Sequence, residues 1–219
     1  MASLRGTTMG EKYIGKEMMR HSRFNEYLKG KEEAFLEKVA HKVDAYIQED
    51  HIYCDKGNYQ HLCNIFTSMA LHEVLVQEGV EAEEAERIVF DTMYAYMQKQ
   101  RKTFERLARH NWFWSFIKKI VPIGFKKGSG VGWRYTWHKD TPKNEFVFEC
   151  NRCIYLPIFL KHGYARFAPK FCHNDIIVYG SLPYTDFIRT KTLSRGDDCC
   201  DFRFVRYKKK EQFKRSESV

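Results

Sequence analysis

The hydrophobic pattern of this 219-residue chain changes once, at the segment KKGSGVG (residues 126–132). Before this segment, apolar residues recur at helical spacing over residues 31–50, 59–79 and 81–109. After it, short segments alternate between apolar and polar residues, which is typical of strands. Helices followed by strands predict an α+β protein, with a helical N-terminal half and a mostly antiparallel sheet after it.

The second half also contains helical segments between its strands. We expect two strands at residues 131–138 and 145–150, followed by a helix that begins at Cys153 and another over residues 169–179. A hairpin then forms around the turn at residues 195–198, where Gly196 precedes two aspartates. The sheet is therefore predicted to have two helices inserted in it.

The composition predicts a packed globular chain. Hydrophobic residues make up 43% and aromatic residues 16% of the sequence, enough for one sizeable core. We expect a single domain over residues 1–219. Its helical part would cover residues 1–110 and its sheet-rich part, which carries the cysteine motifs, residues 126–207. A basic tail would follow at 208–219.

A short aromatic segment, WFWSFIKKIVPIGF, occupies residues 112–125. We expect it to end at Pro122, because proline interrupts helical hydrogen bonding. Two interpretations remain: the segment touches a membrane surface, or it packs over the next element. It is too short to span a bilayer, so packing is the interpretation we adopt, and we expect no membrane partner.

The net charge of +9 favours an anionic partner, although much of the excess is concentrated near the C-terminus. No helix-turn-helix, zinc-finger or RNP signature is present, so we expect no nucleic-acid partner. The first fifteen residues lack the apolar stretch of a signal peptide, and no run reaches transmembrane length. We therefore expect a cytoplasmic protein whose seven cysteines are core residues, ligands or nucleophiles.

Five of the cysteines lie in the second half. Cys150 and Cys153 form a CxxC motif, which is typical of zinc or redox sites. The redox interpretation requires a parallel βαβ unit, which the pattern does not predict. The zinc interpretation requires a second pair at similar spacing, whereas Cys199 and Cys200 are adjacent. Adjacent residues of a strand point to opposite faces, so these two thiols must serve different purposes.

Two of the cysteines have surroundings suited to chemistry. Cys153 would stand at a helix N-terminus beside Arg152, and both features favour a thiolate. Cys172 and Asp175 are three residues apart on a predicted helix, so they share one face. The alternative for Cys172 is a small buried apolar residue.

Three segments carry a family resemblance: NRCIYLPIFLKHG, APKFCHNDI and TKTLSRGDDCCDFRF. They resemble the L-2-amino-thiazoline-4-carboxylic acid hydrolase family. Its pattern has a cysteine that opens a helix after a strand, a Cys-x-x-Asp on the next helix, and a Gly-Asp-x-x-Cys-Asp-Phe strand. The resemblance covers roughly residues 130–205. The matching positions are Cys153, Cys172, Asp175, Gly196, Asp197, Cys200, Asp201 and Phe202, whereas Cys150 and Cys199 are outside the pattern.

The resemblance implies a hydrolase acting on carbon–nitrogen bonds of cyclic amidines. Water would open a 2-amino-thiazoline-4-carboxylate-like ring and leave a carbamoyl-cysteine-type product. Cys153 or Cys172 would be the nucleophile, Asp175 would handle the proton, and Cys200 would reach the same pocket. An arginine would pair with the carboxylate of this small-molecule substrate. The candidates are Arg152, Arg195 and Arg203.

Two further interpretations remain open. The Gly-Asp-x-x-Cys-x-Phe ending also resembles the small-molecule-binding domains related to 4-vinyl reductase. The alternative function is thus a non-catalytic metal- or ligand-binding domain, with zinc or iron held by Cys153, Cys172 and Cys200. The third interpretation is that these cysteines only pack the core. For the hydrolase we expect no cofactor, and the sequence is compatible with a homo-oligomer.

Overall fold

The structure is a computed structural model that describes residues 13–207. By its internal contacts the chain divides into two compact units, each described by itself below. The first contains the described residues up to Tyr96, with residues 127–132 and 154–166. The second contains residues 97–126, 133–153 and the described residues from 167 onward. The expectation of a single domain stays a prediction, and the predicted basic tail lies outside the described residues.

The first unit is helical, which confirms the predicted helical N-terminal half. Central to it is α5 (Tyr59–Gln77), which is buried around most of its circumference. This burial follows from a sequence with apolar or small residues on all sides, and Gly79, with a φ of 89°, follows the end of the helix. The other elements are α2 (Gly15–His21), α3 (Asn25–Leu28), α4 (Glu33–Glu49), the 3₁₀ turn η1 (His51–Tyr53), the first part of α6 (Ala82–Ala108) and α8 (Tyr155–Lys161).

The glycine-rich segment at residues 126–132, where the hydrophobic pattern changes, is held by hydrogen bonds. Its backbone is anchored within the first unit, where Val131 N donates to Asp55 Oδ2 at 2.7 Å and Gly130 N donates to Asn58 Oδ1 at 3.1 Å. A side chain at Gly130 would collide with the Asp55 carboxylate, so glycine is required for this close approach.

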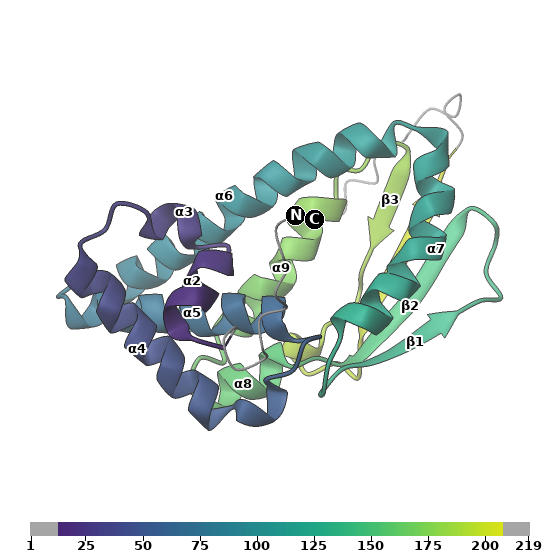
Figure 1. The fold of residues 1–219 in the computed structure, drawn as a ribbon. Helices are drawn as coiled ribbons and strands as arrows, with labels where there is room; N and C mark the ends of the chain where they lie inside the picture. The colour runs from purple at the N-terminus through teal and green to yellow at the C-terminus, as the bar shows by residue number, and fades with distance from the viewer. Residues whose placement is uncertain (1–12, 208–219) are drawn as a thin grey trace, which may run out of the picture. The chain divides into compact units, whose positions relative to one another are not determined.

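The second unit contains a four-stranded sheet with the order β1-β2-β4-β3, in which every neighbouring pair is antiparallel (Figure 1). Its strands are β1 (Arg134–His138), β2 (Glu145–Arg152), β3 (Thr185–Ile188) and β4 (Cys200–Arg206). In the sequence, α8 and α9 (Phe167–Tyr179) fall between β2 and β3. The predicted α+β class and the two inserted helices are therefore confirmed.

Aromatic residues on one face of the sheet set its register. Phe148 of β2 lies opposite Phe202 of β4, with their rings stacked at a centroid distance of 4.7 Å. The next residue of β2 on the same face is Cys150, which lies opposite Cys200. A shift by one residue would turn these side chains to the other face, so the aromatic pairs also hold the two cysteines opposite one another.

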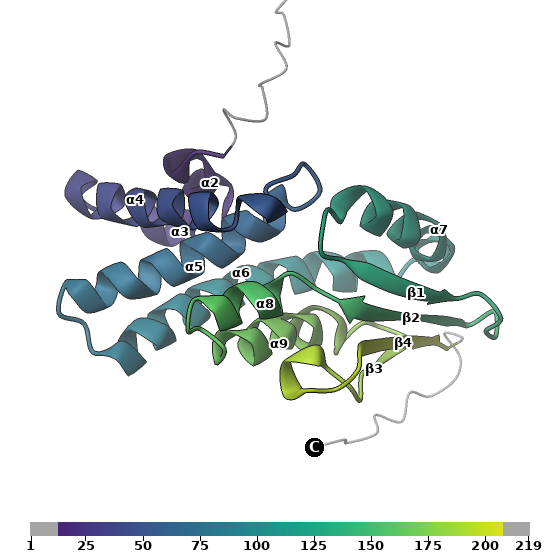
Figure 2. The ribbon, with the colours of Figure 1, turned by 90° about the horizontal axis from the view of Figure 1, so that it is seen from below.

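Two helices cover this aromatic face. Tyr179 of α9 contacts the ring of Phe204 at 5.5 Å. Phe125 of α7 (Asn111–Gly128) contacts the ring of Phe148 at 5.6 Å. Figure 2 shows α7 lying along β1 and β2. One side of this helix therefore packs over the following strands, as we expected for residues 112–125.

The helix α7 does not end at Pro122 as we expected, because Pro122 lies inside it. Proline removes one backbone hydrogen bond, but Phe113 and Phe125 on either side of it pack against other elements of the unit. Packing at both ends therefore outweighs the local preference of proline. No helix within residues 13–207 is both long and apolar enough to cross a membrane.

Candidate functional site

A cluster of sulfur atoms lies in the second unit where β2 ends and β4 begins. Cys150 and Cys200 are 5% and 6% exposed. Cys172 of α9 is half-buried and forms hydrogen bonds with the side chains of Cys200 and Ser194. The cluster thus joins two strands, one helix and the 3₁₀ turn η2 (Leu193–Arg195).

The adjacent cysteines of β4 diverge, as strand alternation requires. Cys200 interacts with Cys172 and Cys150. Cys199 is also buried, but the charges that affect its pKa are Asp198, Glu149, Lys191 and Asp201. Cys200 is therefore the thiol of this pair that belongs to the cluster.

The Gly-Asp-x-x-Cys-Asp motif shapes the loop that brings Ser194 to Cys172. Asp197 Oδ2 accepts a hydrogen bond from Thr192 N at 2.7 Å, and Cys200 Sγ accepts one from Leu193 N at 3.3 Å. Gly196 adopts a φ of 90°, which favours glycine.

Asp201 stabilises the start of the same loop through hydrogen bonds. It accepts hydrogen bonds from the backbone of Thr190 at 2.9 Å and Lys191 at 2.5 Å, and from Thr190 Oγ1 at 2.7 Å. The carboxylates of this motif therefore organise backbone, whereas its cysteine enters the sulfur cluster.

Arg189 contacts the backbone of Cys172 and was missed by the sequence analysis. Its Nη1 donates to the carbonyl oxygen of Cys172 and to Asp175 Oδ2, both at 2.8 Å. The Arg189 side chain is only 8% exposed, whereas that of Asp175 is 34% exposed, so the arginine of this ion pair is the partner shielded from solvent. Arg189 directly follows β3 and belongs to no recognisable motif, so nothing in the sequence marked it.

The environment of Cys172 favours its thiolate. The pKa of Cys172 is lowered to about 7, and the largest cause is its hydrogen bond with Cys200, whose S–H donates. Burial opposes this effect, and the Ser194 hydroxyl reinforces it. The charge of Asp175 raises this pKa and that of Arg189 lowers it. Cys172 is thus a thiol that ionises near neutral pH.

The neighbouring thiols retain their protons. Donating to Cys172 raises the pKa of Cys200, and burial raises it further. Burial raises the pKa of Cys150, with a further contribution from the nearby charge of Cys153. The cluster therefore favours the thiolate on Cys172 and the protonated thiol on Cys200, which donates to it.

The other predicted residues lie at different places around the cluster. Cys153 lies two residues before α8, since this helix begins at Tyr155 rather than at Cys153. Cys150, which we placed outside the motif, donates from Sγ to the carbonyl oxygen of Arg152 at 3.2 Å. Its alternation with buried Phe146 and Phe148 was the sequence signal that could have placed it on the inner face.

The three predicted carboxylate-binding arginines are spread over this region. Arg152 is exposed at the end of β2. Arg195 donates to the carbonyl oxygen of Thr190 at 2.6 Å. Arg203 binds Glu145 through two hydrogen bonds of 2.8 and 2.7 Å, and alternation places it on the opposite face of β4 from Cys200.

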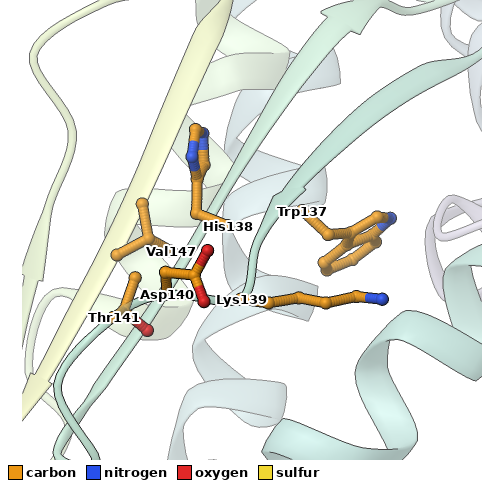
Figure 3. Close-up of a pocket in the computed structure, with 6 residues that line it drawn as sticks. All are labelled: Trp137, His138, Lys139, Asp140, Thr141 and Val147. Atoms are coloured by element: carbon orange, nitrogen blue, oxygen red, sulfur yellow. The ribbon is translucent and has the colours of Figure 1, made fainter.

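Two further geometric features bear on ligands. Within residues 13–207, no group of three or more His, Cys, Asp or Glu side chains is arranged to hold a metal ion. An open surface hollow of about 450 Å³ lies beside the β1–β2 turn (Figure 3). Its lining contains none of the predicted site residues and consists of Trp137, His138, Lys139, Asp140, Thr141 and Val147.

Comparison with known proteins agrees with the resemblance found in the motifs. No curated protein and no solved structure matches the chain. The family model described as L-2-amino-thiazoline-4-carboxylic acid hydrolase matches residues 60–204, more than half of the sequence, and suggests a hydrolase-like function. The match includes α5 of the helical half as well as the whole sulfur cluster. The chain therefore belongs to the L-2-amino-thiazoline-4-carboxylic acid hydrolase family.

Proposed function

We propose that this protein hydrolyses a small cyclic amidine that carries a carboxylate, such as 2-amino-thiazoline-4-carboxylate, with Cys172 as the nucleophile. The observation that carries this proposal is the contrast among the thiols. The pKa of Cys172 is lowered to about 7 by its hydrogen bonds. In contrast, the pKa values of five other cysteines are raised: Cys54, Cys63, Cys150, Cys199 and Cys200. A thiolate at neutral pH is the form that attacks an electrophilic carbon.

The reaction proceeds in two stages. The Cys172 thiolate adds to the amidine carbon of the protonated ring, and one ring bond to that carbon then breaks. The departing ring heteroatom takes a proton, which leaves the opened substrate attached to Cys172 Sγ. Water adds to the same carbon, and the Cys172–carbon bond breaks to regenerate the thiolate. One water is consumed, and the product is a carbamoyl-cysteine.

Cys200 is the residue that we assign to proton transfer. Its S–H already donates to Cys172 Sγ, so it lies within reach of a group that leaves beside that sulfur. The carboxylate of Asp175 is already paired with Arg189 at 2.8 Å, so one of its oxygens is engaged. We therefore assign to Asp175, in place of the proton transfer first expected of it, the positioning of α9 through Arg189.

Arg152 is the best placed of the three arginine candidates for the substrate carboxylate. It is exposed and lies next to Cys153, at the end of β2 that carries Cys150. Arg203 is already engaged with Glu145 on the other face, and Arg195 supports its own loop. Cys153 lies in the same region, and we do not assign it as the nucleophile. The proposed hydrolysis requires no cofactor.

Turnover by single cysteine variants tests the proposal. The purified chain is incubated with 2-amino-thiazoline-4-carboxylate, and free thiol and free amine are measured separately, which also identifies the ring bond that breaks. We expect Cys172→Ala to lower kcat/KM on the order of a thousandfold or more. The matched control is Cys199→Ala, which removes a buried thiol on the opposite face and should retain turnover. Wild-type turnover by Cys172→Ala, or its loss only in Cys153→Ala, would overturn the assignment.

A further inference from the structure

The helix α7 packs against its unit with one side only. Phe113 is buried and Phe125 lies against the sheet. On the other side, four large apolar residues are about half exposed, and we refer to them as the apolar stripe. They are Trp112 (54% exposed), Phe116 (48%), Ile120 (43%) and Ile123 (51%).

The residues of the apolar stripe form one continuous surface. They are spaced by four, four and three positions, so they share one face of the helix. The rings of Trp112 and Phe116 are in contact, with centroids 5.8 Å apart. Single exposed apolar side chains are ordinary, whereas a group of this kind on one helix marks an interaction surface.

The charges on α7 indicate which partner this surface fits. The helix contains four lysines and no aspartate or glutamate. Lys119 and Lys126 are exposed, and helical geometry places them about 20° and 40° from Trp112, along one border of the apolar stripe. An apolar face bordered by cations, with a tryptophan among its residues, suits a bilayer with anionic headgroups.

We propose that α7 docks on the surface of an anionic lipid bilayer, with the apolar stripe inserted between the headgroups and with Lys119 and Lys126 on the phosphate side. We expected no membrane partner from the sequence, because residues 112–125 are too short to span. A helix that lies in the interface does not need that length. The proposal is independent of the hydrolase chemistry.

A second copy of the chain is a less suitable partner for this face. A symmetric contact between two α7 helices would bring Lys119 and Lys126 of both copies together, and the helix offers no carboxylate to neutralise them. Headgroup phosphates would instead neutralise these lysines as the apolar stripe leaves water.

Vesicle flotation of the full-length protein tests the proposal. We expect binding to vesicles of phosphatidylcholine mixed with phosphatidylserine, and weak or no binding to phosphatidylcholine alone. Replacing Phe116 and Ile123 together by serine should weaken binding about tenfold or more, because two of the four apolar side chains of the stripe are then lost. Lys119→Glu with Lys126→Glu should weaken binding to the anionic vesicles and reduce its dependence on salt.

The matched control is Ile188→Ser, which removes an exposed apolar residue of the same unit outside α7. It should bind vesicles as the wild type does, and circular dichroism should show every variant folded. Unchanged binding by the Phe116 and Ile123 variant would overturn the proposal, because some other part of the chain would then hold the vesicle. Absence of binding by the wild-type protein would also overturn the proposal. So would a wild-type dimer in solution that becomes a monomer in the Phe116 and Ile123 variant alone, because the stripe would then contact a second copy.

Discussion

The guanidinium of Arg189 holds two points of α9 at once, the carbonyl oxygen of Cys172 and the carboxylate of Asp175, both at 2.8 Å. It thereby fixes the turn of the helix that carries Cys172 and places a positive charge near this residue. This arrangement fixes the position of Cys172 and engages Asp175, and the charge of Arg189 adds a smaller effect that lowers the pKa of Cys172.

Replacing Arg189 by methionine should therefore affect both stability and the thiol. The substitution leaves the carbonyl of Cys172 and the carboxylate of Asp175 without this donor, and we expect a loss of about 2 kcal/mol in the free energy of unfolding. The pKa of Cys172 should rise, because a positive charge that favours the thiolate is removed. Urea denaturation and pH-dependent alkylation measure the two effects. Arg203→Met, which breaks a solvent-exposed pair, should change neither appreciably, and equal effects in both variants would contradict this role of Arg189.

Native-state alkylation should distinguish the cysteines. With iodoacetamide at neutral pH, we expect Cys172 to be modified well before Cys199 and Cys200, because its pKa is near 7 and theirs are raised. Peptide mass spectrometry over a time course measures the order. If Cys200 reacted first, the direction of the hydrogen bond between the two sulfurs would be the reverse of the one described.

The pH dependence of turnover should follow the Cys172 thiolate. Its pKa in the folded protein lies below the ordinary thiol value, so kcat/KM should rise with pH through about 7. It should fall again at higher pH, where the ring loses the proton that the addition requires. Removing the Ser194 hydroxyl by Ser194→Ala takes away a donor that favours the thiolate, so this rise should move to higher pH. Thr136→Ala, which removes a hydroxyl on β1 that binds Asn151, serves as control and should leave the profile in place. A profile unchanged by Ser194→Ala would show that this serine does not act on the thiolate.

Pro122 should reduce the stability of α7. Pro122→Ala restores a backbone N–H in the helix interior and removes the steric conflict of the ring, so we expect the free energy of unfolding to rise by about 1 kcal/mol or more. Pro169 supplies a control, because it lies in the first turn of α9, where a backbone N–H has no helical partner. Pro169→Ala should give the smaller change in urea denaturation. A loss of stability in Pro122→Ala would mean that the proline is favoured by its surroundings.

Much of the fold followed from local patterns. Helical spacing before residue 126 and alternation after it predicted the α+β class, and the positions of the inserted helices were correct to within a few residues. The spacing of Cys172 and Asp175 placed them on one helix face, where both meet Arg189. These features are determined by periods of two and 3.6 residues, which are properties of the sequence itself.

The chemistry of the site depended on contacts between distant segments. Strand register places Cys150 opposite Cys200, and the loop closed by Asp197 and Asp201 brings Ser194 to Cys172. Packing at both ends of α7 keeps the helix continuous through Pro122, and the apolar stripe on its other side stays exposed. Local periodicity determined which residues share a face of a helix or strand. Only tertiary packing decided which faces meet, and hence which thiol becomes a thiolate, because hydrogen bonds and burial act across space and not along the sequence.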